Sequence, residues 1–308
     1  MRRRGPSVAG IDSDVRNRGA GFRLIVLAAG LVCAANAARA QEEVPFITTP
    51  DRVTVAMLEL AGVAAADHVI DLGSGDGRIV ITAAKRFGAS GLGVEIVPDL
   101  VHKSRANARA AGVAERTEFR EQDLFTTDLG RATVVTMYLL PEVNLQLRPR
   151  LLALMPGTRI VSHDWDMGEW APDKMLTLDV PDKAIGREKK SRVFLWVVPA
   201  QVQGTWCSNA GGADRRDSDL RLEVTQRFQR FSAALQMRRA AAPLAVLDGR
   251  IEGPTLRTES ANAAAPWQAH LQWQTHTDRA PTLQVMRMSG AGGPYAGRSF
   301  SRAATAGC

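Results

Sequence analysis

Between residues 44 and 200 the chain alternates two kinds of hydrophobic pattern. Short apolar runs such as His68-Val69-Ile70-Asp71-Leu72 end in glycine or polar residues, and such runs predict strands. Stretches with apolar residues three or four positions apart separate them and predict helices. The predicted strands are 68–72, 91–96, 117–119, 132–138, 159–162, 176–180 and 192–198, and the predicted helices are 53–60, 79–87, 100–111 and 144–155. Strands that alternate with helices indicate an α/β domain over residues 41–200, with a mostly parallel sheet and helices on both faces, as in Rossmann-like folds.

After residue 200 the pattern changes to alternation with period two, which is typical of half-buried antiparallel strands. Residues 220–224 alternate in this way, and segments 267–275 and 282–288 predict further strands. Residues 246–251 have the pattern of a β-hairpin with Asp248-Gly249 as its turn. Residues 201–308 therefore predict a small accessory β-rich domain.

The first 40 residues have the organisation of a secretory signal peptide. Arg16, Arg18 and Arg23 precede an uncharged stretch over 24–38, which is too short to span a bilayer. Ala38-Arg39-Ala40 then forms an A-x-A cleavage site. We therefore expect residues 1–40 to be a signal peptide and the mature chain to be exported, to the periplasm or to a membrane. The alternatives are an uncleaved apolar anchor and a misassigned start codon, the latter leaving a cytoplasmic protein.

The net charge of +7 is unevenly distributed along the chain. It is +5 in residues 1–40, −3 in 41–200 and +5 in 201–308, where every basic residue is arginine. Because a nucleic-acid-binding protein concentrates basic residues on its working domain, the slightly acidic segment 41–200 predicts no nucleic-acid partner. Five histidines at 68, 102, 163, 270 and 276 lack the spacing of metal ligands, and three cysteines are too few for a four-cysteine zinc site, so we expect no metal.

The strand over 68–72 leads directly into the glycine-rich turn Gly73-Ser74-Gly75-Asp76-Gly77 and then into a helix. Glycines allow positive φ angles and let a ligand approach the backbone. The dinucleotide motif G-x-G-x-x-G requires Gly or Ala at position 78, where this chain has Arg78. The carboxylates of Asp71 and Asp76 would repel a pyrophosphate and attract an ammonium or a sulfonium. The loop therefore favours S-adenosylmethionine (SAM) over NAD.

Two further acidic residues follow neighbouring predicted strands. Glu95 ends the second strand, where a carboxylate can bind a ribose diol, and Asp123 follows the third, where it would meet the adenine amino group. Because the carboxyl ends of parallel strands line one crevice, these residues and the glycine loop form one predicted cofactor site. Its members are Asp71, Gly73, Ser74, Gly75, Asp76, Gly77, Glu95 and Asp123.

These stretches resemble class I SAM-dependent methyltransferases. More narrowly, they are similar to the protein-lysine methyltransferases that modify the c-ring protein of ATP synthase and the adenine nucleotide translocase, and to their bacterial relatives. The resemblance covers 44–173 and is carried by DLGSGDGRIV (71–80), GVEI (93–96), ATVVTMYLLP (132–141) and PGTRIVSHD (156–164). It implies a Rossmann-like methyltransferase with SAM bound by Asp71, Gly73, Gly75, Glu95 and Asp123. It also implies that residues 46–50 close over the methionine end of SAM.

Six residues near the ends of the fourth and fifth strands are candidates for contact with the methyl acceptor: Tyr138, Glu142, His163, Asp164, Trp165 and Asp166. We take Tyr138, His163 and Asp164 as the candidate catalytic residues, although each also has an ordinary structural role open to it. A lysine acceptor must lose a proton, which costs roughly 4.6 kcal/mol at pH 7. Amide methyltransferases often carry Asn/Asp-Pro-Pro-Tyr at this place, and Tyr138-Leu139-Leu140-Pro141 lacks the amide, which argues against a glutamine or adenine acceptor. Trp165 and Trp170 could line an alkylammonium pocket or form an apolar lid.

Three functional hypotheses remain open at this point. The first is a protein-lysine methyltransferase, whose substrate could be membrane-associated. The second is a methyltransferase with a small-molecule acceptor, and the third is an exported binding protein that keeps the fold without turnover. The predicted signal peptide keeps the third hypothesis open, because SAM is chiefly a cytosolic cofactor.

Cleavage after Ala40 would remove Cys33 and leave an even pair of cysteines, Cys207 and Cys308. Gly204-Thr205-Trp206 faintly resembles the opening of lipocalin-like barrels, and an antiparallel barrel brings its first and last strands side by side. We therefore expect a Cys207–Cys308 disulfide in an exported protein. The alternative is two unrelated thiols in a cytosolic one.

Overall fold

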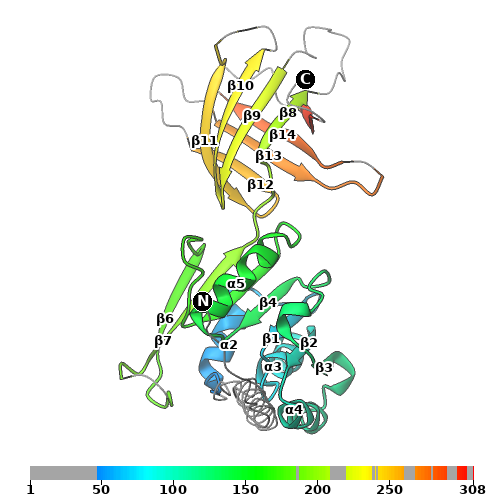
Figure 1. Cartoon of the computed structure of the whole chain (residues 1–308), viewed down its shortest axis with the longest axis vertical. Helices are drawn as coiled ribbons and strands as arrows, with labels where there is room; N and C mark the ends of the chain where they lie inside the picture. Colours follow the sequence, from blue (N-terminus) through cyan, green and yellow to red (C-terminus); the bar gives the residue numbers. More distant parts are fainter. Residues whose placement is uncertain are drawn as a thin grey trace, which may run out of the picture. The chain divides into compact units, whose positions relative to one another are not determined.

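A computed structural model describes residues 47–184, 187–208, 220–237, 240, 242–259, 268–278, 280–289, 297–303 and 308. The predicted signal peptide over 1–40, Phe46 and Trp267 lie outside these residues. The described chain forms a seven-stranded sheet and a closed β-barrel (Figure 1). The sheet strands are β1 (His68–Leu72), β2 (Ser90–Glu95), β3 (Thr117–Glu121), β4 (Val134–Met137), β5 (Arg159–His163), β6 (Lys174–Asp179) and β7 (Lys190–Val197).

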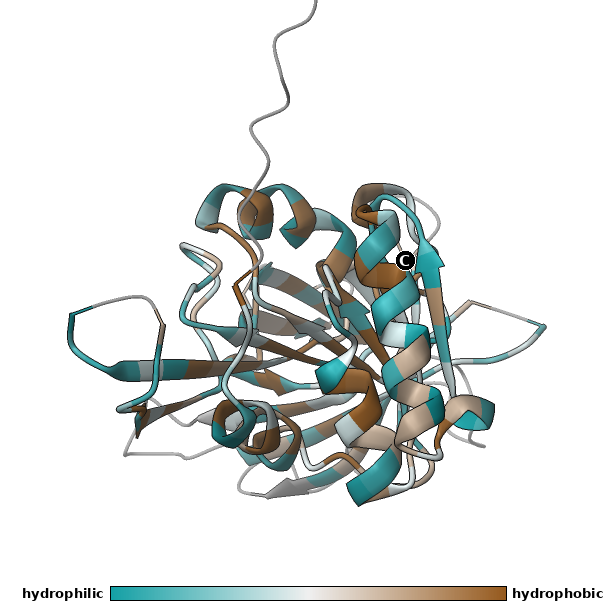
Figure 2. Ribbon diagram, turned by 90° about the horizontal axis from the view of Figure 1, so that it is seen from below, coloured by the Kyte–Doolittle hydropathy of each residue, from teal (hydrophilic) through white to brown (hydrophobic). Residues whose placement is uncertain are grey.

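Helices cover both faces of the sheet, as the sequence predicts. They are α2 (Asp51–Leu60), α3 (Arg78–Phe87), α4 (Pro98–Ala110) and α5 (Pro141–Leu152). Met57 of α2 packs with Val161 on one face, and Leu147 of α5 packs with Met137 on the other. Apolar and polar residues alternate in bands along these helices (Figure 2), because one side of each faces the sheet. Within the described part of the chain, no helix combines the length and the apolarity needed to cross a membrane.

The strand order of the sheet is β3-β2-β1-β4-β5-β7-β6. β1, β2, β3, β4 and β5 are parallel, whereas β7 runs antiparallel to β5 and β6 antiparallel to β7. The order reverses between β1 and β4, so the chain leaves these two neighbouring strands in opposite directions. In open α/β sheets ligands bind at this switch point, outside the carboxyl ends of the strands. The predicted Rossmann-like fold class is confirmed.

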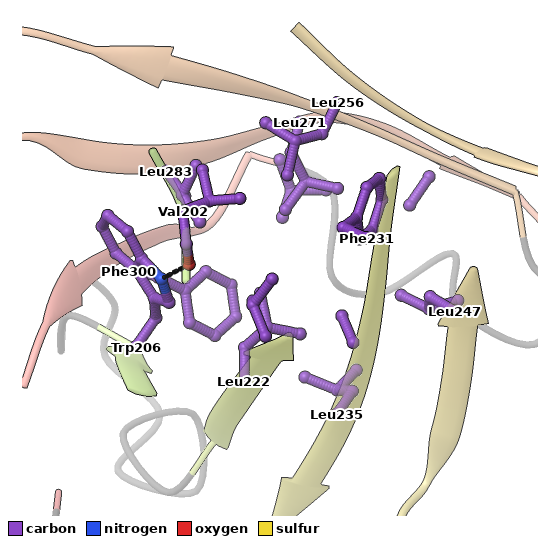
Figure 3. Packing of buried hydrophobic residues seen from close by; sticks show 14 of the residues in the cluster. Val202, Trp206, Leu222, Phe231, Leu235, Leu247, Leu256, Leu271, Leu283 and Phe300 are labelled. Carbon is purple, nitrogen blue, oxygen red and sulfur yellow. Dashed lines mark hydrogen bonds between the residues drawn. The ribbon is translucent and has the colours of Figure 1, made fainter. Parts of the chain in front are cut away.

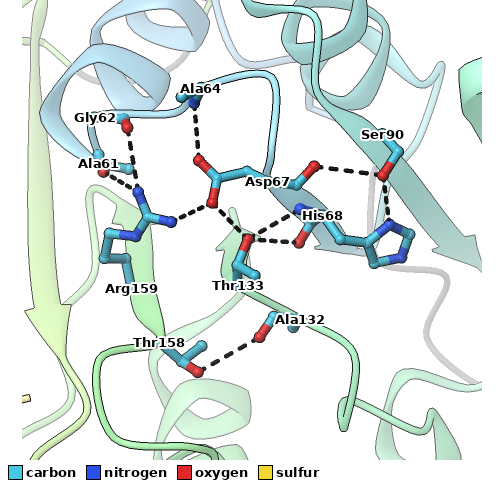
Figure 4. A network of polar contacts seen from close by, with 10 residues as sticks. All are labelled: Ala61, Gly62, Ala64, Asp67, His68, Ser90, Ala132, Thr133, Thr158 and Arg159. Carbon is cyan, nitrogen blue, oxygen red and sulfur yellow. Dashed lines mark hydrogen bonds and ion pairs between the residues drawn. The ribbon is translucent and has the colours of Figure 1, made fainter. Parts of the chain in front are cut away.

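The opposite, amino-terminal ends of β1, β4 and β5 are joined by a polar network around Asp67 (Figure 4). Its carboxylate accepts hydrogen bonds from Thr133 Oγ1 at 2.7 Å and from the Ala64 backbone N–H at 2.8 Å, and it pairs with Arg159. Burial opposes ionisation of Asp67, but these hydrogen bonds outweigh it and lower its pKa. The network fixes the strands at the end away from the predicted site.

The second part is a closed barrel in which each strand pairs with its sequence neighbours and β8 pairs with β15. Its strands are β8 (Gly204–Ser208), β9 (Leu220–Arg227), β10 (Arg230–Met237), β11 (Ala245–Glu252), β12 (Thr255–Glu259), β13 (Gln268–Gln274), β14 (Thr282–Ser289) and β15 (Ser299–Arg302). Apolar side chains such as Leu222, Phe231 and Leu283 fill the interior, and buried Trp206 donates its ring N–H to the Val202 carbonyl at 2.8 Å (Figure 3). This is the up-and-down barrel arrangement that lipocalins also use.

The predicted hairpin turn at Asp248-Gly249 is wrong, because both residues lie inside the continuous strand β11. Gly249 pairs with Phe231 of β10 and with Thr258 of β12. A Cβ atom there would stand 2.1 Å from the Arg257 carbonyl oxygen and 2.8 Å from the Phe231 ring. The glycine is needed for close approach of neighbouring strands, and the actual turn is formed by Gly253 (φ 56°) and Pro254 between β11 and β12.

The predicted disulfide is present between Cys207 of β8 and Cys308, whose Cα atoms are 5.5 Å apart. The first and last barrel strands pair directly, Cys207 lying opposite Ser301 of β15. The bond closes a loop of 101 residues in sequence and ties residue 308 to the barrel.

Candidate active site

The glycine loop between β1 and α3 is a tight left-handed turn. Gly73, Gly75 and Gly77 have φ angles of 75°, 53° and 82°. The backbone N–H groups of Gly73 and Ser74 both donate to the Val94 carbonyl at 2.9 Å, which holds the loop against β2. The loop thereby presents its backbone at the switch point of the sheet.

Asp71 lies beneath this loop and is buried. Thr136 Oγ1 donates to its carboxylate at 2.7 Å across the β1–β4 pair. Burial raises the pKa of Asp71 to about 7, and the nearby carboxylates of Glu95 and Asp76 add to the rise. A buried carboxyl group that titrates near neutrality would be stabilised in its ionised form by a cationic ligand.

From the sequence, we expected the Asp76 carboxylate to attract a cationic ligand, but its environment in the structure is different. Both of its carboxylate oxygens accept hydrogen bonds from the Arg78 guanidinium, at 2.9 and 2.7 Å. Burial opposes ionisation of Asp76, but the Arg78 hydrogen bonds and charge outweigh it and lower its pKa. Arg78 Nη1 also donates to the Thr49 carbonyl at 2.8 Å. Asp76 therefore fastens the loop, through Arg78, to the segment preceding α2, and its charge is already neutralised by Arg78.

Glu95 and Asp123 stand where β2 and β3 end, as predicted. Glu95 Oε2 accepts the Gly75 N–H at 3.0 Å, and Oε1 accepts the Ile96 and Val97 N–H groups at 2.8 and 3.1 Å. Asp123 is exposed, and its Oδ1 accepts the Phe125 N–H at 2.8 Å. Glu95 is thus a rigid carboxylate in direct contact with the glycine loop.

The chemistry of these residues fits SAM. Ser74 Oγ is buried within the loop without a hydrogen-bond partner among the described residues. Asp71 supplies a carboxyl group poised for a cation, and Glu95 supplies a fixed hydrogen-bond acceptor. A glycine backbone, an unpaired hydroxyl and carboxylates at successive strand ends together suit a ligand with amino, sulfonium and ribose groups.

Tyr138, His163 and Asp164 are brought together at the ends of β4 and β5. The Tyr138 hydroxyl makes a long hydrogen bond of 3.5 Å to Asp164 Oδ2. The rings of Tyr138 and His163 have centroids 4.0 Å apart. His163 is fully buried, with Nε2 2.9 Å from Ser191 Oγ and Nδ1 3.3 Å from Thr49 Oγ1. The predicted catalytic residues therefore form one cluster, with His163 behind Tyr138.

Burial sets the protonation states in this cluster. It raises the pKa of Tyr138 to about 12, and the Asp164 charge acts in the same direction. It lowers the pKa of His163 to about 4, against the attraction of Asp164. At neutral pH the tyrosine is therefore a hydroxyl donor and the histidine is uncharged. We infer that His163 positions Tyr138 and Thr49.

Lys183 belongs to the same cluster and was not among the sequence candidates. Its Nζ lies 2.6 Å from Asp164 Oδ2 and 2.6 Å from the Lys190 carbonyl oxygen. Asp164 has a left-handed backbone (φ 64°), and its Oδ1 accepts the Arg192 N–H at 3.0 Å. No motif marks Lys183, because the antiparallel return of β6 and β7 alone brings it to Asp164.

The other candidates lie elsewhere. Glu142 is exposed in the first turn of α5, and Asp166 accepts the Gly168 N–H at 2.9 Å in a local turn. Trp165 is 40% exposed. Trp170 is completely buried and packs against Trp196, so the prediction that it lines or covers an acceptor pocket is wrong.

A cavity of about 350 Å³ is lined by Thr48, Pro50 and Arg78 and by Asp182 and Ala184, the two sequence neighbours of Lys183. Thr49, which lies between Thr48 and Pro50, contacts both His163 of the cluster and Arg78, the residue after the glycine loop.

The strand order, the reversed β7, the glycine loop at the switch point and the acidic residues at successive strand ends define a class I SAM-dependent methyltransferase. The sequence profile described as the ANTKMT methyltransferase domain matches residues 71–174. A protein-lysine N-methyltransferase from Saccharolobus islandicus is 44% identical over 138 residues, which are 44% of this chain and 86% of that relative. The chain belongs to the same methyltransferase family as the Saccharolobus protein.

Two other similar proteins match over different shares of their length. The adenine nucleotide translocase lysine N-methyltransferase of Mus musculus is 32% identical over 131 residues, 42% of this chain and 57% of that protein. The crystal structure of an RNA methyltransferase from Salinibacter ruber, in complex with S-adenosyl-L-homocysteine, is 52% identical and has a TM-score of 0.46. The match covers 51% of this chain and 96% of the Salinibacter chain.

Proposed function

We propose that this methyltransferase modifies the ε-amino group of lysine in a protein. One observation carries the proposal: the Asp164 carboxylate, beside the Tyr138 hydroxyl, already holds a lysine ammonium, that of Lys183, at 2.6 Å. A site that selects an alkylammonium needs a carboxylate to attract it and little water around it. The Saccharolobus relative, a protein-lysine N-methyltransferase, supports the same acceptor class.

SAM supplies a methyl group on a positively charged sulfur. The residues of this chain have to bind the acceptor, orient its nitrogen and remove water. Asp164 attracts the ammonium, and Tyr138, which stays protonated, donates a hydrogen bond to Asp164. Deprotonation of a free lysine costs roughly 4.6 kcal/mol at pH 7. Burial of the amine reduces this cost by disfavouring the charged form, whereas the Asp164 charge binds the ammonium and acts in the opposite direction.

A nucleic-acid acceptor is less well supported by the charge distribution. The Salinibacter protein is described as an RNA methyltransferase. In this chain, however, residues 41–200 carry a net charge of −3, and the acceptor cluster contains a carboxylate where a phosphate would be repelled. A small-molecule amine would satisfy Asp164 as well as a protein lysine does, so the experiment must separate these acceptors.

The test is methyl-labelled SAM added to the full chain with three acceptor pools: membrane and soluble protein, total RNA, and a small-metabolite extract. Label in protein, located on lysine after hydrolysis, is the expected result. Label only in RNA or only in metabolites would refute the proposal. An Asp164→Asn variant is the matched control, because it keeps the shape of the side chain and removes the charge that attracts the acceptor.

A further inference from the structure

We propose that Lys183 is a methylation site of the enzyme itself, modified within the same molecule. The proposal rests on the lysine specificity proposed above and concerns one residue of this chain. Nothing in the motif residues requires a lysine at this position. Lys183 lies in the connection between the antiparallel strands β6 and β7 (Figure 1), which brings it to the cluster of Tyr138, His163 and Asp164.

Lys183 differs from the other lysines of the chain. The sequence contains six, at 85, 103, 174, 183, 189 and 190, and all of them lie in the described residues. Five are exposed, whereas the Lys183 side chain is only 11% exposed. The exposed lysines therefore serve as internal references for any chemical difference at Lys183.

The Lys183 amine is held next to Tyr138 by its ion pair with Asp164. Its Nζ lies 2.6 Å from Asp164 Oδ2, the oxygen to which Tyr138 also donates. Asp164 follows β5 and Tyr138 follows β4, the strand next to β1 and its glycine loop. Leu139 approaches this loop so closely that a Cβ atom on Gly73 would stand 3.0 Å from it. The amine is thus placed at the carboxyl end of β5, on the same edge of the sheet as the glycine loop and two strands from β1.

The cavity described above is lined by the two sequence neighbours of Lys183. Asp182 and Ala184 line it together with Arg78, which is fastened to the glycine loop through Asp76. Asp164, which holds the Lys183 amine, has a left-handed backbone with φ 64°.

The transfer balances as an ordinary substitution. The Lys183 ammonium loses one proton, accepted by Asp164 or by solvent, and its nitrogen lone pair forms the new N–C bond. The S–C bond breaks and its electron pair stays on sulfur, which leaves neutral S-adenosylhomocysteine and a methylated ammonium. Repetition on the same nitrogen would give two or three methyl groups.

The first experiment needs no cofactor. Brief acylation of the full chain with acetic anhydride, followed by peptide mass spectrometry, measures the reactivity of all six lysines. Lys183 is expected to react about tenfold more slowly than Lys189, as a charge-assisted hydrogen bond of ordinary strength implies. In Asp164→Asn the two rates should become similar. Equal rates in the unsubstituted protein would overturn the placement of Lys183.

The second experiment adds SAM and a lysine-bearing protein acceptor to the full chain. Methyl groups are expected on Lys183 and at most at trace level on the five exposed lysines, with a rate per molecule independent of enzyme concentration. Lys183→Arg should abolish this modification, whereas Lys189→Arg should retain it.

The outcomes separate the two proposals. Methylation of the added acceptor without Lys183 overturns self-methylation and leaves the proposed function standing. Methylation of neither overturns both. Methylation spread evenly over the exposed lysines, or a rate that rises with enzyme concentration, shows transfer between molecules and overturns the intramolecular reaction.

Discussion

The Tyr138 hydroxyl and the Asp164 carboxylate lie 3.5 Å apart although 26 residues separate them in sequence. They meet because β4 and β5 are neighbouring parallel strands that end at the same edge of the sheet. Burial keeps the tyrosine protonated and His163 uncharged, so Asp164 is the acidic member of this cluster, and Lys183 pairs with it. The first prediction follows from this pair.

Tyr138→Phe and Asp164→Asn should lower the rate of methyl transfer and leave SAM affinity nearly unchanged. Loss of a charged hydrogen-bond partner costs about 1.5–3 kcal/mol, which corresponds to at least tenfold in kcat/KM. Steady-state kinetics and calorimetric titration measure the two quantities. Asp166→Asn is the control, because Asp166 accepts its hydrogen bond in a separate turn. Normal turnover in both variants would place catalysis elsewhere.

Glu95→Ala should weaken SAM binding by about tenfold or more, since a lost carboxylate acceptor costs about 1.5–3 kcal/mol. The same carboxylate accepts the Gly75 N–H, so the glycine loop should also become more mobile when this hydrogen bond is lost. The measurement is calorimetric titration, with circular dichroism to verify folding. Glu121→Ala is the matched control, because Glu121 pairs with Glu95 in the sheet and is exposed. Unchanged affinity in a folded Glu95→Ala protein contradicts the cofactor assignment.

Asp71→Asn should stabilise the protein at pH 8 more than at pH 5. The folded pKa of Asp71 is raised from 3.8 to about 7, so its contribution to stability is fully present below about pH 4 and is lost as the pH rises through 7. Asparagine stays neutral and can still accept the Thr136 hydrogen bond. The relative gain between the two pH values is about 2.6 kcal/mol, because part of the effect of the raised pKa is already present at pH 5, and it is measurable by urea denaturation.

Asp128→Asn, at an exposed position, provides the comparison for this effect. Asp71→Asn should in addition weaken SAM binding, because the neutral side chain cannot balance a cation. If the stability difference is the same at pH 5 and pH 8, Asp71 is not protonated in the folded state at pH 5.

Reduction of the Cys207–Cys308 disulfide should destabilise the barrel. In the chain-entropy model a closed loop of about 100 residues contributes about 4.7 kcal/mol. Thermal denaturation with and without reductant measures the effect. The double variant Cys207→Ser and Cys308→Ser should unfold at the temperature of the reduced protein and should not respond to reductant. An identical melting temperature in all samples would contradict a stabilising bond.

Export is a proposal from the first 40 residues. Intact-mass and N-terminal analysis of protein purified from its native compartment without reductant should find Gln41 as the first residue. The same sample should contain no free thiol at Cys207 or Cys308. An N-terminus upstream of Gln41 together with two free thiols would refute export.

The fold was largely predictable because its signals are local. β1 begins and ends as predicted at His68 and Leu72, since a buried parallel strand is a continuous apolar run bounded by polar and glycine residues. The positions of Glu95 at the end of β2 and of Asp123 after β3 also agree with the prediction, because the strand periodicity defines where each strand ends. These features depend on neighbours in sequence.

Other features depend on distant parts of the chain. Asp248-Gly249 has a turn sequence, but the Phe231 ring and the Arg257 carbonyl on neighbouring strands require glycine in a straight strand. Lys183 joins Asp164 only through the pairing of β6 with β7. The sequence predicts these two strands. It does not predict which side chain of the connection between them lies beside Asp164.

Residues 201–308 belong to the same chain as an enzyme whose proposed methyl acceptor is the amino group of lysine. Residues 201–308 contain no lysine, and their 13 basic residues are all arginine, whose guanidinium keeps its proton and is a poor nucleophile. The barrel domain thus carries a net positive charge without a lysine that the methyltransferase domain could modify.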